Sequence, residues 1–336
     1  MSPKDVFILG AGFSSAINPQ MPTTKDLTIM ISKTAAQYGL NLPAPLKNAQ
    51  SNGKELDENI ELWMTYLSQD QPWLDAHHNL QNKATAAQLR RRIRAIIEDC
   101  TNQTTTSPPP SWLITLIKQW HKHNAAVITL NYDTLVERAT MMNSLSLGAG
   151  HLYPPYLSNI RSRVEAPSHS TLIDTFKYYK LHGSVNWHYS GREIFYGETI
   201  YYSDVSRWGI LGEDEQESRL YTMDKETLLI PPVTEKTTFF NNETVRQLWQ
   251  QSSSVLGSAR RVFVIGYSLP LSDLGMCFFL THSQPILGTN WYVVNKDKSA
   301  ASRFSELLAP QQVICDDFVG GCDSVARFVE EYLSMV

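Results

Sequence analysis

The sequence KDVFILGAGFSS, residues 4–15, decides how this chain folds. Its apolar run VFIL passes directly into Gly10, Ala11 and Gly12, and the residues after these glycines can begin a helix. A strand, a glycine turn and a helix in this order are the outline of a nucleotide-binding unit. Glycine permits the tight turn and lets the backbone approach a pyrophosphate, while the free N–H groups at the helix start supply positive partial charge.

The glycine turn departs in two ways from the usual dinucleotide fingerprint. Ser15 stands where the third glycine is expected, and no Asp or Glu closes a clear second strand about 20 residues later. By itself, the turn is compatible with a flavin enzyme, a dehydrogenase or a βα unit with a purely structural role. The rest of the chain has to decide between them.

Composition places the chain among globular proteins and excludes several classes. Its 336 residues are 42% hydrophobic, enough for one large or two modest domains. The chain has 29 basic and 33 acidic residues and no long basic block, so we expect no nucleic-acid binding. The sequence shows no signal peptide and no run of about 18 apolar residues, so we expect a cytoplasmic protein without a membrane span.

Cysteine usage points away from disulfides and from a zinc ribbon. The four cysteines include no Cys-x-x-Cys pair, so neither a zinc module nor a disulfide pattern is predicted. A reducing cytoplasm fits this usage best. The cysteines are Cys100, Cys277, Cys315 and Cys322.

Buried-type strands alternate with helical patterns along most of the chain. This alternation predicts an α/β fold, a Rossmann-like doubly wound parallel sheet that binds its ligand at the carboxyl ends of the strands. The expected strands are 6–9, 125–130, 176–181, 261–265, 291–294 and 312–315. The expected helices are 24–38, 55–68, 80–100, 112–122, 134–142, 238–259, 271–281, 299–308 and 324–335.

The remaining stretches predict two insertions into one domain that spans 1–336. Residues 24–100 form a helical cap, with Thr24 capping its first helix, and residues 144–229 form an irregular second insertion. A polar, proline-rich linker is expected at 101–110 and loops at 41–53 and 208–217.

Polar or small residues follow four of the expected strands. These strand ends read GAGFS at 10–14, TLNYD at 129–133, KLHG at 180–183 and GYSL at 266–269, and Asn295 ends a fifth strand. In this order they resemble the sirtuin superfamily, and more closely its bacterial SIR2-like branch of NAD-consuming defence effectors. The match extends over nearly the whole chain.

The resemblance implies that NAD+ is the substrate and that Asn131 and His182 are the catalytic pair, with Asp133 supporting them. His182 can titrate near neutral pH and accept a proton from a ribose hydroxyl or a water. Asn131 offers a carbonyl and an NH2 group to a water or a ribose hydroxyl. In the alternative reading, Asn131 and Asp133 only cap the next helix, and His182 is a core or surface histidine.

The resemblance also assigns the residues that hold the dinucleotide. The glycine turn contacts the pyrophosphate, the GYSL segment contacts a phosphate or the adenine ribose, Asn295 contacts that ribose, and the adenine meets the segment after Cys315; Thr23 is a further binding residue. The implied binding residues are Gly10, Ala11, Gly12, Phe13, Ser14, Thr23, Gly266, Ser268, Asn295 and Asp317, with Asp316 and Phe318 beside the last. Read alone, GYSL is also typical of an ordinary turn.

The chain departs from sirtuin deacylases at two places. It has no cysteine between Cys100 and Cys277, where those enzymes carry a four-cysteine zinc module. Their Pro-Asp-Phe-Arg stretch is replaced by MPTTK at 21–25. A peptide cleft beside a zinc module therefore has no evident counterpart, and water is the simpler acceptor. We expect no metal.

The leading hypothesis is an NAD+ glycohydrolase that produces ADP-ribose and nicotinamide as the toxic effector of a bacterial antiphage system. Such an enzyme needs control, so we expect a homo-oligomer or an association with a HerA-type ATPase or another sensor protein. The alternatives are an NAD-dependent protein deacylase or ADP-ribosyltransferase, and a catalytically silent sensor of NAD or ADP-ribose.

Overall fold

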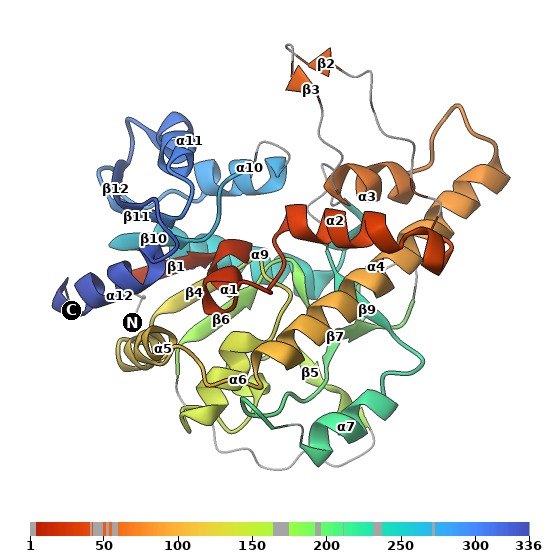
Figure 1. Ribbon diagram of the computed structural model, residues 1–336, viewed down its shortest axis with the longest axis horizontal. Coiled ribbons are helices and arrows are strands. Elements are labelled where there is room, and N and C mark those ends of the chain that lie inside the picture. The colour runs from red at the N-terminus through yellow and green to blue at the C-terminus, as the bar shows by residue number, and fades with distance from the viewer. Residues whose placement is uncertain are drawn as a thin grey trace.

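A six-stranded parallel sheet forms the centre of the molecule (Figure 1). The computed structural model describes residues 5–40, 42, 50–51, 54–55, 60–163, 175–191, 196–210, 212–230, 237–270 and 273–335. The sheet has the order β12-β11-β10-β1-β4-β6, and every neighbouring pair is parallel. Its strands are β1 (Asp5–Leu9), β4 (Ala126–Thr129), β6 (Lys177–Lys180), β10 (Arg261–Ile265), β11 (Asn290–Asn295) and β12 (Val313–Val319).

This strand order confirms the predicted fold class. Numbered by their appearance in the chain, the six strands run 3-2-1-4-5-6 across the sheet, which is the order of a dinucleotide-binding Rossmann fold. The order reverses between β1 and β10, where the chain moves from one half of the sheet to the other. Ligands of such sheets bind at that reversal, outside the carboxyl ends of the strands.

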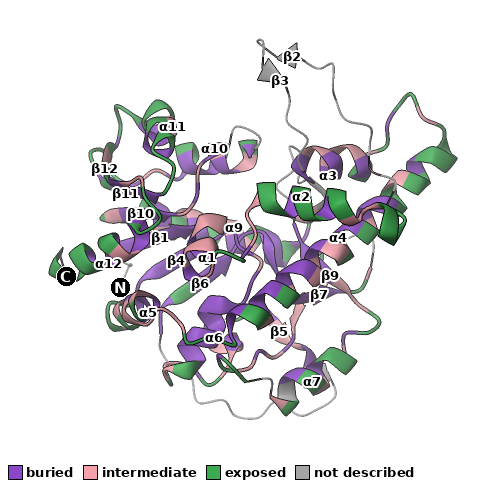
Figure 2. Ribbon diagram, in the orientation of Figure 1, coloured by how far each residue is buried: buried purple, intermediate pink, exposed green. Residues whose placement is uncertain are grey.

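An aromatic ladder on one face of the sheet anchors two covering helices. Phe7, Phe263 and Tyr292 are register partners on adjacent strands, and their rings stack with centroids 4.8 and 5.0 Å apart. Trp120 of α5 (Ser111–Lys122) and Tyr332 of α12 (Ser324–Met335) contact the Phe7 ring edge-on. The central strands β1, β4 and β10 are almost entirely buried, whereas the edge strand β12 is largely exposed or half-buried (Figure 2). Because buried aromatic rings of the sheet pack against those of α5 and α12, this face of the sheet forms a rigid base for the site.

The remaining helices of the sheet domain connect its strands. They are α1 (Ala11–Ile17), α6 (Leu135–Met142), α8 (Thr237–Phe240), α9 (Glu243–Gly257), α10 (Leu274–His282) and α11 (Ser299–Leu308). Phe304 of α11 packs between Trp291 of β11 and Tyr267, so this helix covers the face opposite the aromatic ladder.

The segment between β1 and β4 forms a helical cap beside the sheet (Figure 1). Its long helix α4 contacts α2 and α3, and Arg94 of α4 donates to the Thr227 hydroxyl at 2.9 Å, which ties the cap to β9 (Glu226–Leu229). The cap comprises α2 (Thr24–Thr34), η1 (Ala36–Tyr38), β2 (Gln50–Ser51), β3 (Lys54–Glu55), α3 (Ile60–Ser68) and α4 (Ala76–Thr104). None of the helices in the described part of the chain combines the length and apolarity needed to cross a membrane.

A second, smaller sheet lies within residues 144–229. It has the order β5-β8-β7-β9, and α7 packs nearby through the Arg138–Glu215 ion pair, whose atoms are 2.9 Å apart. Strand β6 of the main sheet also falls inside this range. The elements are η2 (Ala149–His151), β5 (Ser158–Asn159), η3 (Ile160–Arg163), β7 (Gly183–Tyr189), β8 (Tyr201–Tyr202), α7 (Glu213–Leu220) and β9 (Glu226–Leu229).

Two predictions of local structure in these insertions were wrong. Thr23, and not Thr24, caps α2, because Thr23 and Asp26 form a reciprocal capping box. The expected loop 208–217 contains the start of α7, whose Glu215 is buried against Arg138. Tertiary ion pairing therefore stabilises a helix that has no apolar periodicity.

The bounds of several other elements differ from the prediction. The helix expected at 238–259 is divided into α8 and α9, because Asn242 accepts from the N–H of Val245 and begins a new helix. Helix α4 continues to Thr104 into the expected linker. Asp273 is the N-cap of α10, which begins at Leu274, and residues 271 and 272 of the predicted helix lie outside the described residues. Most of the predicted loop 41–53 also lies outside the described residues.

Candidate functional site

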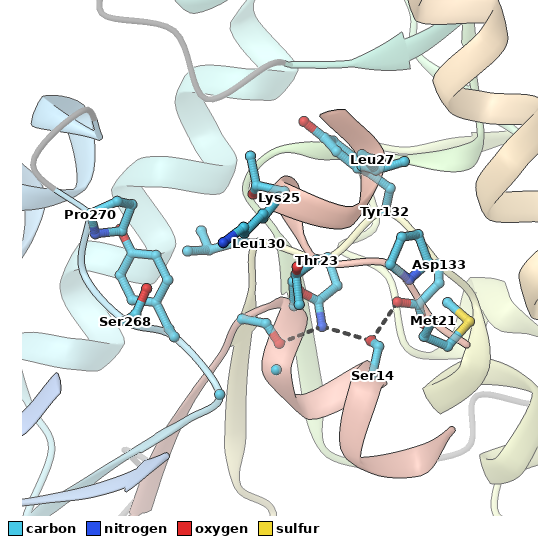
Figure 3. Close-up of a pocket in the computed structure, with 18 of the residues that line it drawn as sticks. Ser14, Met21, Thr23, Lys25, Leu27, Leu130, Tyr132, Asp133, Ser268 and Pro270 are labelled. Carbon is cyan, nitrogen blue, oxygen red and sulfur yellow. Dashed lines mark hydrogen bonds between the residues drawn. The ribbon is translucent and has the colours of Figure 1, made fainter. Parts of the chain in front are cut away.

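A cavity of about 690 Å³ lies at the carboxyl ends of β1, β4, β6, β10 and β11, beneath the cap (Figure 3). This volume is in the range of small-molecule and cofactor sites. The structure brings most of the sequence-predicted site residues to its wall. Those that line it are Gly10, Ala11, Gly12, Ser14, Thr23, Asn131, Asp133, His182, Gly266, Ser268 and Asn295.

Two predicted binding residues lie elsewhere. Phe13 is buried on the other side of α1, where its ring meets Trp112 at a centroid distance of 5.7 Å. Asp317 is exposed and does not line the cavity. The strand expected to end at Cys315 continues as β12 to Val319 through an irregularity in its pairing, so Asp317 lies before the carboxyl edge of the sheet.

The glycines of the first turn are required by a close crossing of two backbones. A Cβ added to Gly12 would lie 2.8 Å from the Cα of Gly266, and one added to Gly266 would lie 2.1 Å from the backbone nitrogen of Phe13. Gly266 also has φ of +67°, which L side chains rarely adopt. The turn after β10 therefore occupies the space that a side chain at position 12 would need. This backbone contact requires glycine there whether or not a ligand binds.

The backbone N–H groups of this turn are largely used inside the protein. Gly10 donates to the carbonyl of Ile265 at 3.0 Å, Gly12 to that of Gly266 at 2.9 Å, and Phe13 to that of Gly10 at 2.9 Å. The expectation that the start of α1 presents a set of free N–H groups is therefore wrong for these three. Other groups on the wall have to provide most of the attraction for a bound anion.

A chain of hydrogen bonds fixes the orientation of Asn131 (Figure 3). Its Nδ2 donates to the carbonyl of Gly10 and to Ser14 Oγ, both at 2.9 Å, and Ser14 Oγ donates to Asp133 Oδ2 at 2.6 Å. Because the hydroxyl hydrogen of Ser14 goes to the carboxylate, its lone pairs have to accept from an N–H group. Both amide hydrogens of Asn131 are thus used, and Oδ1 is the atom that the side chain offers to a ligand.

Asp133 connects this chain of hydrogen bonds to the start of α6. Its Oδ1 accepts from the N–H of Leu135, the first residue of α6, at 3.1 Å. Thr134 is the N-cap of that helix, and the other carboxylate oxygen of Asp133 accepts from Ser14, so Asp133 is more than a helix cap. For Asn131, the hydrogen bonds run to the β1 turn, which favours the reading in which the side chain belongs to the site.

His182 occupies the strand end next to Asn131. Only 3% of the residue is exposed, and its ring lies 6.5 Å, between centroids, from the rings of both Tyr132 and Trp249. Its carbonyl accepts from the N–H of Ile230 at 2.9 Å, and the Tyr132 hydroxyl donates to the Ile230 carbonyl at 2.8 Å. These contacts hold the imidazole in an aromatic surrounding at the cavity wall.

Sequence reasoning missed several charged and phenolic residues of the wall. Two buried carboxylates, Glu61 from α3 and Asp273 from α10, line the cavity with Tyr132 and Tyr267. The Tyr267 hydroxyl donates to Asp273 at 3.0 Å. Burial first, and then the negative charges of Asp273 and Glu61, raise the pKa of Tyr267 well above its ordinary value, so this phenol stays protonated. No motif in the sequence marks these residues as a set.

Two lysines and a paired carboxylate complete the charged part of the wall. Lys25 follows Thr23 in the MPTTK stretch, and Lys296 and Asp297 follow Asn295; all three line the cavity. Hydrogen bonds from Arg303 and Ser299 lower the pKa of Asp297 to about 2. The sequence could have indicated Lys296 and Asp297 as site residues, because they directly follow an expected strand end.

Arg303 joins the strand ends of β10 and β11. It donates through Nε to the Ser268 carbonyl at 2.6 Å and through Nη2 to Asp297 Oδ2 at 2.8 Å. One guanidinium therefore fixes two adjacent parts of the cavity wall.

Comparison with known proteins leaves the family of the chain open. No protein-family model matches it, and no curated protein matches it. Among solved structures, one described as the structural basis of sirtuin substrate affinity matches with 16% sequence identity and a TM-score of 0.40, over 97% of this chain and 93% of the other.

A search of the described residues finds no group of three or more His, Cys, Asp or Glu side chains that could hold a metal ion. His182, Asp133 and Glu61 each line the cavity, yet they do not form such a group.

Proposed function

We propose that the chain is an NAD+ glycohydrolase, which converts NAD+ and water into ADP-ribose, nicotinamide and a proton. One observation carries this proposal. At the strand-order reversal of a Rossmann-type sheet, the oxygen of a fixed asparagine amide and a histidine meet at one cavity. The resemblance of the five strand-end motifs to the SIR2-like branch supports the choice of reaction.

The proposed reaction breaks the bond between the nicotinamide nitrogen and the anomeric carbon of its ribose. The electron pair of this bond neutralises the pyridinium ring, and an oxocarbenium-like sugar is left for the water oxygen to attack. The protein then has to hold the ribose, orient the water and accept its proton.

We assign these tasks to Asn131 and His182. Because both N–H groups of Asn131 are committed, its Oδ1 can only accept, from a ribose hydroxyl or from the attacking water. His182 acts as the general base that takes the proton of the water or of the ribose hydroxyl. Asp133 supports Asn131 through Ser14, and does not contact the sugar itself in this scheme.

The dinucleotide is proposed to lie from the glycine turn towards Asn295. Since Gly12 and Phe13 use their N–H groups internally, Lys25 and Lys296 are the cations on the wall that we assign to the pyrophosphate. Ser268 and Asn295 lie at neighbouring strand ends and suit the hydroxyls of the adenosine ribose.

A role as the toxic effector of an antiphage system, control by self-assembly or by a HerA-type ATPase, and a cytoplasmic location are further parts of the proposal that rest on the sequence resemblance. The lack of cysteines between Cys100 and Cys277 supports water over an acetylated peptide as the acceptor. An NAD-dependent deacylase would consume NAD+ only together with such a peptide.

The test is the release of nicotinamide from NAD+, followed by chromatography, by the parent chain and by Asn131→Ala and His182→Ala. We expect kcat to fall by about 100-fold or more in each variant, since a general base alone contributes about 10²- to 10⁴-fold. His123→Ala is the matched control, because His123 is an exposed residue at the end of α5. It should keep the parent rate.

Two results would contradict the proposal in different ways. Variants as active as the parent would refute the site assignment. A parent that binds NAD+ in calorimetry and never cleaves it, even when concentrated to favour assembly, would support the silent-sensor alternative.

A further inference from the structure

A buried ion pair lies directly behind the proposed site. Lys180, the last residue of β6, and Glu137 of α6 are 3.0 Å apart, and both side chains have 0% exposure. Neither lines the cavity. Burying two charges is expensive, and well-packed apolar residues in place of such a pair are often equally stable. Stability alone therefore does not explain why this ion pair is buried here.

The lysine makes a second contact that bears on the site. Its Nζ donates to the backbone carbonyl of Asp133, two residues after Asn131, while Lys180 itself stands two residues before His182. A single side chain thus connects the strand end that carries the histidine with the turn 131–133 that carries the asparagine. Hydrogen bonds to charged groups are roughly twice as strong as neutral ones.

Strand pairing does not depend on this side chain. The backbone N–H of Lys177 donates to Ala125 at 3.1 Å and that of Leu181 to Thr129 at 3.0 Å, and these bonds hold β6 against β4. Just after β4 has ended, the Tyr132 carbonyl accepts from the N–H of Val185 at 3.0 Å, and Lys180 adds a charged hydrogen bond to the next carbonyl, that of Asp133.

Glu137 keeps the lysine in place. Its Oε1 accepts from Lys180 and from the Tyr153 hydroxyl, the latter at 2.8 Å. Burial and the Glu137 charge both raise the pKa of Tyr153, so the phenol remains a donor. Since Glu137 lies in the first turn of α6, the helix that follows turn 131–133, the contact also ties the turn to its own helix.

We propose that Lys180, held by Glu137, is a positioning residue that sets the placement of Asn131 relative to His182. This inference rests on the proposed function for its effect on turnover, whereas its structural part concerns the turn 131–133 alone. Removal of the pair should loosen that turn and leave the binding wall around Gly266 and Asn295 unaffected. The loss should then appear in kcat and not in KM.

The chain provides a matched control pair one residue along α6. Arg138 and Glu215 are 2.9 Å apart with side-chain exposures of 6% and 7%. Arg138 contacts α7 and Thr134, and none of its hydrogen bonds reaches residues 131–133. Neutralising this pair removes a similar buried charge contact from the same helix while the turn keeps its lysine.

The experiment compares Lys180→Met/Glu137→Gln with Arg138→Met/Glu215→Gln and the parent chain. The double changes keep each pair neutral, so neither leaves an isolated buried charge. Nicotinamide release gives kcat and KM, and hydrogen exchange measured by mass spectrometry reports the N–H groups of residues 131–134 and of β10 separately. A thermal unfolding scan checks that each variant is folded.

For the Lys180 variant we expect kcat to fall by about 10- to 100-fold with KM changed by less than about threefold, as for a misplacement of about 1 Å. Exchange in residues 131–134 should be roughly tenfold faster, with β10 unchanged. The Arg138 variant should match the parent in kcat, in KM and in the exchange of residues 131–133; Thr134 is left out of this comparison because Arg138 bonds to its hydroxyl. Parent-like exchange in residues 131–134 of the folded Lys180 variant would overturn the proposal.

The experiment distinguishes a wrong assignment of the reaction from a wrong role of Lys180. A parent chain that releases no nicotinamide refutes the glycohydrolase, and the exchange rates still decide whether Lys180 holds the turn. If the Met/Gln variant does not fold, Lys180→Gln/Glu137→Gln takes its place. In this variant the two side chains can still form a hydrogen bond. Faster exchange in residues 131–134 would again support the proposal, and parent-like exchange would overturn it.

Discussion

The two walls of the cavity are built in opposite ways. The sheet wall, residues 10–12, 14, 131–133, 182 and 266–268, is buried or half-buried and internally hydrogen-bonded, with Asn131, Asp133 and His182 only 8%, 5% and 3% exposed. The cap wall, residues 21–29 with Glu61 and Ile97, includes exposed residues such as Lys25 and Ile29, the latter 42% exposed.

This difference separates two tasks of the site. Chemistry needs groups held within a fraction of an ångström, and strand ends locked by backbone crossings provide this. Enclosure of a ligand needs a surface that can adapt, and a helix tied to the rest by a few polar contacts is suited to it. Changes in the sheet wall should therefore have larger effects than changes in the cap wall.

The largest effect is expected at the glycine crossing. Gly266→Ala would place a Cβ 2.1 Å from the Phe13 nitrogen at a φ of +67°, so strain and overpacking add up. We expect a loss of about 4 kcal/mol in the free energy of unfolding, measured with urea. Gly288→Ala is the matched control, because Gly288 also has positive φ, +81°, but nothing lies within 4 Å of its Cβ position. It should cost about 1 kcal/mol. Equal losses would show that the crossing is not tight.

Ser14→Ala should be the next largest change, since it cuts the hydrogen-bond chain between Asn131 and Asp133. The substitution leaves a buried amide N–H and a buried carboxylate oxygen without this partner. We expect a loss of about 2 kcal/mol in urea unfolding, and about tenfold in nicotinamide release. Ser258→Ala, at an exposed hydroxyl, should be neutral. A Ser14→Ala chain as stable and active as the parent would contradict the orientation assigned to Asn131.

Buried His188 of β7 makes the stability of the folded chain pH-dependent. Burial first, and then the nearby charges of Arg94 on α4 and Lys225, lower its pKa to about 3. In the unfolded chain the pKa is about 6.5, so the unfolded state takes up the proton first as the pH falls. The contribution of His188 to stability is therefore complete above about pH 7 and declines by about 1.4 kcal/mol per pH unit between about pH 6 and 4.

The measurement for His188 is the free energy of unfolding as a function of pH, with His188→Gln as the variant. Because a glutamine side chain cannot titrate, the slope between about pH 6 and 4 should decrease by about one proton. His123→Gln, at an exposed position, should keep the parent slope. An unchanged slope in His188→Gln would mean that the histidine is already charged in the folded chain.

The smallest effect is expected in the cap wall. Thr23→Ala removes the capping box at the start of α2 and should cost about 1 kcal/mol of unfolding free energy. Thr34→Ala, at the end of the same helix, is the control and should cost less, since its hydroxyl bonds only to carbonyls of its own helix. A loss at Thr23 as large as that at Gly266 would show that the two walls are equally rigid.

The sequence could predict the sheet because parallel strands buried on both faces read as continuous apolar runs, as β1 and β10 do. It could predict much of the site for a related reason, since residues just after such strands have to meet at one edge. The strand-end positions of Asn131, His182 and Gly266 follow from this rule, while their roles came from the resemblance, and all three line the cavity.

The misses at α7 and in the cavity wall have one physical origin, which is contact between residues far apart in the chain, whereas the misplaced caps of α2 and α9 are local. Helix α7 has the sequence EDEQESRL, without apolar periodicity, and depends on Arg138, 77 residues from Glu215. Glu61 and Asp273 come to the cavity through the packing of the cap and the position of α10. Phe13 was assigned to the ligand although α1 turns its ring into the core.

The most direct test of the account is the fate of NAD+ in the presence of the parent chain and of Asn131→Ala at equal concentration. We expect the parent to release nicotinamide and ADP-ribose in a one-to-one ratio, and the variant to do so at least about 100-fold more slowly. NAD+ that remains intact with the parent, or equal rates for parent and variant, would contradict it.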